Sequence, residues 1–148
     1  MTIGSPGAAE WALTVGGVNT SGKVLRWSSR GPTLDKRIKP DVSAPGQFVL
    51  GDFYLKGTSF ATPFATAIAG VVNRDVKHAK ITQKIVSLSS SPFPEFLYAS
   101  TRRREIFELR KNIDVRNIGG YGIVNAVRAA EWGRIFQNHK ALKEGDEV

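Results

Sequence analysis

The alternation of apolar and polar positions near the start of the chain predicts two short strands. Apolar, partly β-branched residues fill 11–18, and a second such stretch covers 23–28. Ser21 and Gly22 separate the two stretches and mark a turn. We therefore expect two strands joined by a tight connection.

The next part of the chain predicts a loop followed by more extended structure. Gly, Pro and charged residues dominate 28–46, and each proline keeps the residue before it out of helix. We expect an irregular but well-fixed segment here. Residues 47–56 favour one or two short strands, with Gly51 and Asp52 as the turn between them.

A helix is predicted from Ser59 to Val72. This stretch contains no charged residue, and alanines recur in it every four positions. A helix that is apolar on all sides is typical of a buried helix. Pro63 is compatible with it because backbone N–H groups of the first turn have no partner within a helix.

The second half of the chain gives weaker patterns. Residues 73–80 are polar and should lead to solvent, 81–88 suit a short surface helix, and 89–94 read as a linker. The stretch 101–117 fits a helix or a strand, and the pattern leaves both open.

The last part of the chain predicts a turn and then a helix. Glycines at 119, 120 and 122 favour a tight turn, and Asn125 suits the N-cap of a helix that runs through Trp132. We expect the tail from Lys140 onward to be frayed.

Composition indicates one globular domain. The chain has 148 residues, of which 41% are hydrophobic and 23% charged, and it contains no cysteine. No apolar run reaches the roughly 20 residues of a membrane helix, and 1–12 lack the pattern of a signal peptide. We expect a soluble chain without a membrane partner, whose compartment the sequence leaves unknown.

The net charge of the chain is +8, and six of its 21 basic residues gather in a basic stretch at 102–116. Such a stretch could bind nucleic acid or an acidic partner, which would make the chain a noncatalytic binding or scaffold module. No aromatic interleaving or nucleic-acid motif accompanies it, so a solvated face is the simpler interpretation and nucleic acid is an unlikely partner.

The motif with the clearest chemistry is Gly57-Thr58-Ser59-Phe60-Ala61-Thr62-Pro63. It matches the G-T-S-x-A-x-P signature around the active serine of subtilisin-like serine proteases, the subtilase or peptidase S8 family. Four further segments resemble that family in the same order: Ser5-Pro6-Gly7 with 13–18, 28–32, 39–46 and 120–125. The chain therefore resembles the C-terminal portion of a subtilase catalytic domain.

The resemblance implies an α/β fold with the later strands of a mainly parallel sheet, a buried helix after the serine and a C-terminal helix. The whole chain, 1–148, would then be a partial catalytic domain. About 5–132 match the family, and 133–148 form a tail. The resemblance implies a serine endopeptidase with Ser59 as the catalytic residue and with Gly57, Thr58 and Ala61 shaping the site. The family is often extracellular, and its members act on polypeptides.

The position of Ser59 makes chemical sense without the resemblance. A serine hydroxyl is a weak nucleophile, and the start of a helix provides unpaired N–H donors and a positive dipole end for a developing oxyanion. Gly57 can adopt backbone conformations barred to other residues. Ser59 could equally be a simple N-cap.

The resemblance also implies that catalytic groups are missing. Subtilases use Asp, His and Ser in that order, with an Asn in the oxyanion hole. Only 58 residues precede Ser59, and none of them is a histidine. We expect the Asp, His and Asn to lie upstream of Met1, the isolated chain to be almost inactive, and the missing N-terminal part to be its partner.

Other arrangements within the chain are less suitable. Ser59, Asp114 and His139 follow the order of α/β-hydrolases, but Ala61 replaces the glycine of G-x-S-x-G. His78 lies far along the serine helix, and we expect both histidines at the surface. Asp41 is expected to play a structural hydrogen-bonding role.

No organic cofactor and no metal site is predicted from the residues. Paired carboxylates at the spacing of calcium ligands are not found, so calcium is possible by analogy with the family only.

Overall fold

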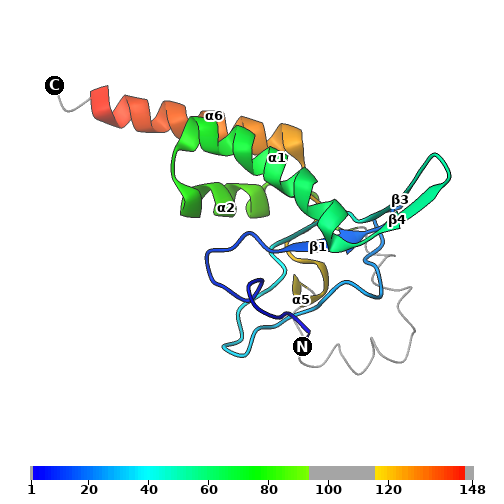
Figure 1. The fold of residues 1–148 in the computed structure, drawn as a ribbon. Coiled ribbons are helices and arrows are strands. Elements are labelled where there is room, and N and C mark those ends of the chain that lie inside the picture. The colour runs from blue at the N-terminus through cyan, green and yellow to red at the C-terminus, as the bar shows by residue number, and fades with distance from the viewer. Residues whose placement is uncertain (1, 94–115, 146–148) are drawn as a thin grey trace.

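The computed structural model describes residues 2–93 and 116–145, and its elements follow one another as strands first and helices afterwards. The strands are β1 (Val15–Val18), β2 (Val42–Pro45), β3 (Gln47–Leu50) and β4 (Phe53–Lys56). The helices are α1 (Thr58–Val76), α2 (Ala79–Leu88), α5 (Arg116–Gly119) and α6 (Ala126–Gly145) (Figure 1).

The strands form two separate pairs. β1 and β2 run parallel, with Val15 opposite Val42, and β3 and β4 form an antiparallel hairpin. The hairpin has its turn at Gly51 and Asp52, which confirms the prediction for 47–56. The expected mainly parallel sheet is thus represented here by one parallel pair, extended by a parallel bridge from Ser43 to Ile123.

Ser43 joins β2 to the segment that precedes α6. Its backbone N–H donates to the carbonyl of Gly122, its carbonyl accepts from the N–H of Val124, and its Oγ donates to the carbonyl of Gly119 at 2.8 Å. Because Ser43 is fully buried, these bonds satisfy polar groups that water cannot reach. The C-terminal segment is therefore part of the β1–β2 layer.

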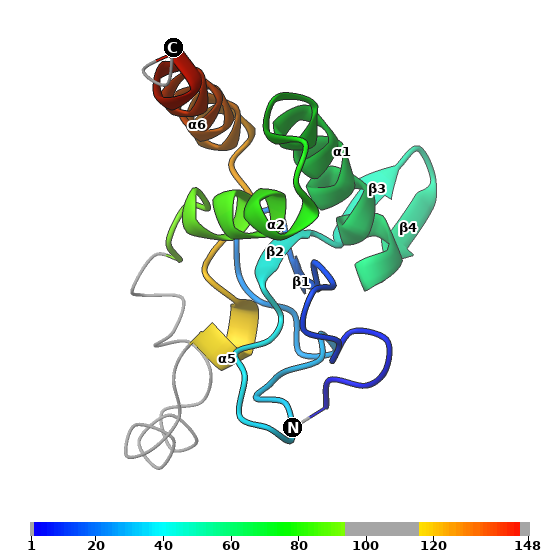
Figure 2. The ribbon, with the colours of Figure 1, turned by 90° about the vertical axis from the view of Figure 1, so that its left-hand side faces the viewer.

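The core lies between this layer and the long helices. Figures 1 and 2 show α1, α2 and α6 gathered on one side of β1 and β2, with α5 and the loops on the other. Buried apolar side chains from β2, α1, α2 and α6 form one cluster: Val42, Ala65, Val72, Val76, Ile85, Val86 and Ala129. This cluster fixes α1, and with it the serine turn, relative to the strands.

Two strand predictions need correction. The second expected strand at 23–28 is reduced to a bridge between Val18 and Val24, because Asn19 Oδ1 accepts bonds from the turn and Ser28 turns inward to accept from Gly17 N–H. Conversely, β2 forms inside the segment expected to be irregular. Proline ends this strand at Pro45 but leaves four residues free to pair with β1.

The serine helix is present where the sequence predicts it, but only one of its faces is buried. Ala61, Ala65, Val72 and Val76 lie inside, whereas Phe64 and Val71 are 46% and 45% exposed. The expectation of burial on all sides is therefore wrong for this chain. The described elements cover the alanine-lined face of α1 and leave the opposite face open to solvent.

The later elements are better packed than their sequence suggests. α2 is half buried rather than superficial, and Ser89, Ser90 and Phe93 of the expected linker are buried.

Asn125 caps α6, since its Oδ1 accepts from Arg128 N–H at 3.0 Å, as predicted. The backbone of α6 remains helical to Gly145, so the prediction of a frayed tail from Lys140 is wrong for residues 140–145. Most of 101–117 lies outside the described residues.

Candidate active site

The junction between β4 and α1 positions Ser59. β4 ends at Lys56, and the N–H of Gly57 donates to the carbonyl of Gly46 at 2.8 Å, which ties the turn to the end of β2. Gly57 has φ 156° and ψ 149°, a combination available almost only to glycine. This backbone conformation turns the extended strand directly into the helix, with Ser59 as the second helical residue.

Ser59 is exposed, and its surroundings favour negative charge. No side chain caps the N-terminus of α1, and its first turn contains no acidic residue. The N–H groups of a first turn lack helical partners, and the helix dipole adds a partial positive charge there. The start of α1 can therefore stabilise an anion that forms beside the Ser59 hydroxyl.

The other predicted site residues take different positions around this turn. Ala61 is completely buried beneath it, and the Oγ1 of Thr62 donates to the carbonyl of Thr58 at 2.9 Å. Thr58 also lines a cavity of about 160 Å³, together with residues of three earlier segments: Ile3, Gly4, Gly7, Thr14, Val15, Ser28 and Ser29. Two of the segments quoted above for their resemblance to subtilases, the first (Gly7, Thr14 and Val15) and the second (Ser28 and Ser29), thus meet next to the serine turn.

Asp41 is part of a buried network rather than of a catalytic group. Its Oδ2 accepts from Thr14 N–H at 2.6 Å and from Lys39 Nζ at 2.7 Å, and its Oδ1 accepts from Gln83 Nε2 at 3.3 Å. This confirms the predicted structural role. Lys39 and Gln83 were not predicted as partners of Asp41, although a lysine two positions from the aspartate was a visible signal.

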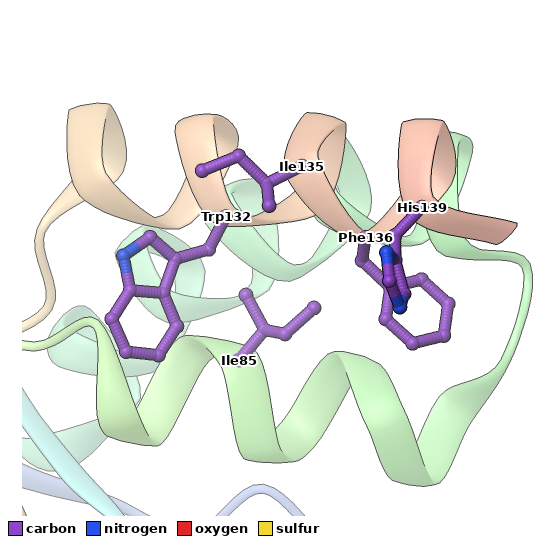
Figure 3. Close-up of a pocket in the computed structure, with 5 residues that line it drawn as sticks. All are labelled: Ile85, Trp132, Ile135, Phe136 and His139. Carbon is purple, nitrogen blue, oxygen red and sulfur yellow. The ribbon is translucent and has the colours of Figure 1, made fainter. Parts of the chain in front are cut away.

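Neither histidine approaches Ser59. His78 lies beyond the C-terminus of the 19-residue helix α1, roughly 27 Å away at ~1.5 Å per residue. His139 lies on α6 beside an apolar hollow of about 330 Å³ between α2 and α6, and its ring points into this hollow with Phe136 (Figure 3). Both histidines are exposed, as expected, and Asp114 lies outside the described residues.

Comparison with known proteins identifies the family. A model described as the Subtilase family matches residues 1–89, which is more than half of the chain. The chain belongs to the subtilase family. Subtilases are serine peptidases, so the resemblance recognised in the sequence is confirmed, and a polypeptide is the substrate class that the family implies.

Individual relatives extend this result. The chain is 34% identical over 98 residues to the serine protease AprX of Bacillus subtilis, covering 48% of this chain and 22% of AprX. It is 24% identical over 170 aligned positions to pyrolysin of Pyrococcus furiosus, covering 87% of this chain and 11% of pyrolysin. It therefore spans less than a quarter of the length of these relatives.

Solved structures confirm the α/β subtilase fold. The prenylagaramide maturation protease PagA superposes with a TM-score of 0.60 at 23% identity, covering 86% of this chain and 44% of PagA. The self-cleaved protease domain of PatA gives a TM-score of 0.58 at 22% identity, covering 88% of this chain and 44% of that domain.

Residues 2–93 and 116–145 of this subtilase contain no group of three or more His, Cys, Asp or Glu placed to hold a metal ion. No helix in this part of the chain is long and apolar enough to cross a membrane.

The basic stretch lies almost entirely outside the described residues. Its last member, Arg116, stacks over the ring of Tyr121, with its guanidinium carbon 5.4 Å from the ring centre. Membership of a peptidase family does not favour the alternative of a noncatalytic binding module.

Proposed function

We propose that this subtilase is a serine endopeptidase whose nucleophile is Ser59. The observation that carries the proposal is the exposed hydroxyl of Ser59 at an uncapped helix N-terminus, directly after the Gly57 turn. In this reaction Oγ attacks the carbonyl carbon of a peptide bond, the C–N bond breaks and the amine leaves with a proton, and water then hydrolyses the acyl-enzyme. The carbonyl oxygen becomes an oxyanion that faces the N–H groups of the first turn of α1.

The attack needs a base that takes the proton from Oγ. Neither histidine of the chain lies near Ser59, so we propose that the imidazole, its aspartate and the oxyanion asparagine come from a further part of the subtilase catalytic domain. Removing such a base costs about a million-fold in turnover in subtilisin. The 148-residue chain alone should accordingly be almost inactive.

The open face of α1 supports this need for a further part. Phe64 and Val71 are nearly half exposed on the helix that carries Ser59, and large exposed apolar groups favour a partner surface. Covering this face would stabilise the chain and bring the missing groups toward the serine turn in one step.

Labelling by a fluorophosphonate probe tests the proposal, because the probe reacts with activated serines. The chain should remain unlabelled alone and become labelled when it is co-produced with a polypeptide that carries the Asp, His and Asn segments of a subtilase. Ser59→Ala should abolish this labelling, whereas Ser21→Ala, at another exposed serine, should not change it.

Hydrogen exchange across α1 provides the control for assembly. Amides at 59–72 should exchange more slowly in the pair than in the chain alone, because the open face becomes covered. A pair that shows this protection and still resists the probe would refute the assignment of Ser59. Labelling of the chain alone would refute the need for an external base.

A further inference from the structure

The β3–β4 hairpin carries an unusual amount of exposed apolar surface. Side chains alternate between the two faces of a strand, so the paired residues divide into two sets. One face, which we call the apolar strip, carries only large apolar side chains: Phe48, Leu50, Phe53 and Leu55. At the outer end of the strip Leu50 is 65% and Phe53 is 72% exposed.

The apolar strip is continuous with the serine turn. Phe48 meets Phe60 edge to face, with ring centres 5.8 Å apart and an interplanar angle of 79°. Phe60 is the residue directly after Ser59 in α1. From this contact the hairpin projects away from the body of the chain (Figure 1), which places Leu50 and Phe53 roughly 7 Å farther out, two residues along each strand.

The opposite face of the hairpin differs at its base. It presents Val49 and Tyr54 near the tip but Gln47 and Lys56 next to Gly57. Polar side chains therefore separate its apolar pair from the serine turn. Only the apolar strip offers an uninterrupted apolar path that begins beside the nucleophile.

We propose that the apolar strip binds an apolar side chain of the polypeptide substrate, a few residues away from the bond that Ser59 attacks. This inference rests on the proposed function, since it takes the occupant to be the chain that reaches Ser59. An extended polypeptide advances ~3.3 Å per residue, so a substrate lying along the hairpin meets Leu50 and Phe53 within a few residues of Phe60.

The backbone of the hairpin suits the same occupant. Among the described residues β3 and β4 pair only with each other, so their outer edges are free to bond an extended peptide. Main-chain bonds at a strand edge bind a peptide regardless of its sequence, and apolar contacts then select its side chains. The hairpin thereby favours substrates with an apolar residue at that position.

Peptide binding to the Ser59→Ala chain tests the strip without any need for turnover. The probe is a short fluorescein-labelled peptide with alternating Leu and Ser, compared by anisotropy with the same peptide in which Ser replaces every Leu. We expect Leu50→Thr with Phe53→Thr to weaken binding of the Leu peptide roughly tenfold or more, and to leave the all-Ser peptide unchanged.

Val49→Thr with Tyr54→Thr is the matched control on the opposite face. Threonine keeps the tendency to form a strand, and circular dichroism should report an unchanged fold for both double variants. The control should bind the Leu peptide like the parent chain. Equal loss in both variants, no preference for the Leu peptide, or tighter binding to phosphatidylcholine vesicles than to the peptide would overturn the inference.

The two proposals fail in different experiments. If the completed protease labels at Ser59 but the Ser59→Ala chain does not prefer the Leu peptide, the apolar strip is not a substrate site and the proposed function stands. If the preference and its loss in the strip variant are found while labelling fails, the strip binds apolar peptides and Ser59 is not the nucleophile.

Discussion

The Nζ of Lys39 lies 2.7 Å from Oδ2 of Asp41, and both side chains are enclosed, with 2% and 11% of their surfaces exposed. The same ammonium donates to the carbonyl of Ala12 at 2.7 Å. Gln83 of α2 also bonds both Ala12 and Asp41. One buried ion pair therefore joins the segment before β1, the segment before β2 and helix α2.

Lys39→Met should destabilise the chain strongly. The substitution leaves the carboxylate of Asp41 buried without its counter-charge, and breaking a buried pair in this way costs about 3–5 kcal/mol. Urea unfolding followed by circular dichroism measures the change. Lys84→Met, at an exposed lysine of α2, should alter the free energy of unfolding by less than about 0.5 kcal/mol.

A double variant separates charge from packing in this prediction. Lys39→Met combined with Asp41→Asn removes both charges and should cost less than Lys39→Met alone. A double variant less stable than the single one would contradict the view that the unpaired carboxylate causes the loss.

Gly120→Ala should also destabilise the chain, for a steric reason. Gly120 has φ 80°, and a Cβ at this position would overlap the carbonyl group of Asp41, whose oxygen accepts from Tyr121 N–H at 2.8 Å. We expect a loss on the order of 3 kcal/mol in thermal or urea unfolding. Gly70→Ala is the matched control, since a Cβ there meets nothing within 4 Å. It should stabilise α1 by about 1 kcal/mol.

The acid side of the stability curve should depend on Asp35. A hydrogen bond from Arg37 Nε at 2.6 Å, supported by one from Thr33 Oγ1, holds the pKa of the Asp35 carboxyl below its ordinary value. A pKa lowered by folding adds stability at pH values above the ordinary carboxyl pKa, and this contribution disappears as the pH falls through the lowered value. The pair is exposed, so the effect should be small and weakened by salt.

Arg37→Gln tests this dependence. It should move the pKa of Asp35 up toward the ordinary range, as followed by the carboxyl carbon resonance in an NMR titration. Arg74→Gln, beside Asp75, should leave the titration of Asp35 unchanged. An unaltered pKa of Asp35 in Arg37→Gln would show that the hydrogen bond is not its cause.

Local rules predicted much of this fold because they act within a few residues. Asn125 caps α6, and Gly51 and Asp52 turn the hairpin, as their residue types indicate, and α1 starts at Thr58, one residue before the predicted start at Ser59. β2 escaped prediction because the prolines at 40 and 45 mask a short strand whose partner β1 lies far away in the sequence. The exposure of Phe64 does not follow from the helix pattern itself, because that pattern reports which side chains are apolar, not which surfaces cover them.

The candidate site likewise has one part that the sequence shows and one part that only the fold shows. The motif around Ser59 is contiguous, so the sequence contains it completely. The cavity beside Thr58 is assembled from segments that begin near Ile3 and Ser28, and its existence depends on how the loops pack. Gln83, one of the partners of Asp41, was missed for this reason too, since it is 42 residues away along the chain.

The bonds that Ser43 makes to Gly119, Gly122 and Val124 also determine when the chain can finish folding. Ser43 and Gly119 are 76 residues apart, so during synthesis β2 leaves the ribosome long before the acceptors for its buried groups exist. The nascent chain must therefore wait with an unfinished sheet while the residues between Ser43 and Val124 are translated. Its vulnerable period, when chaperones or proteases can act on it, lasts until Val124 has left the ribosome.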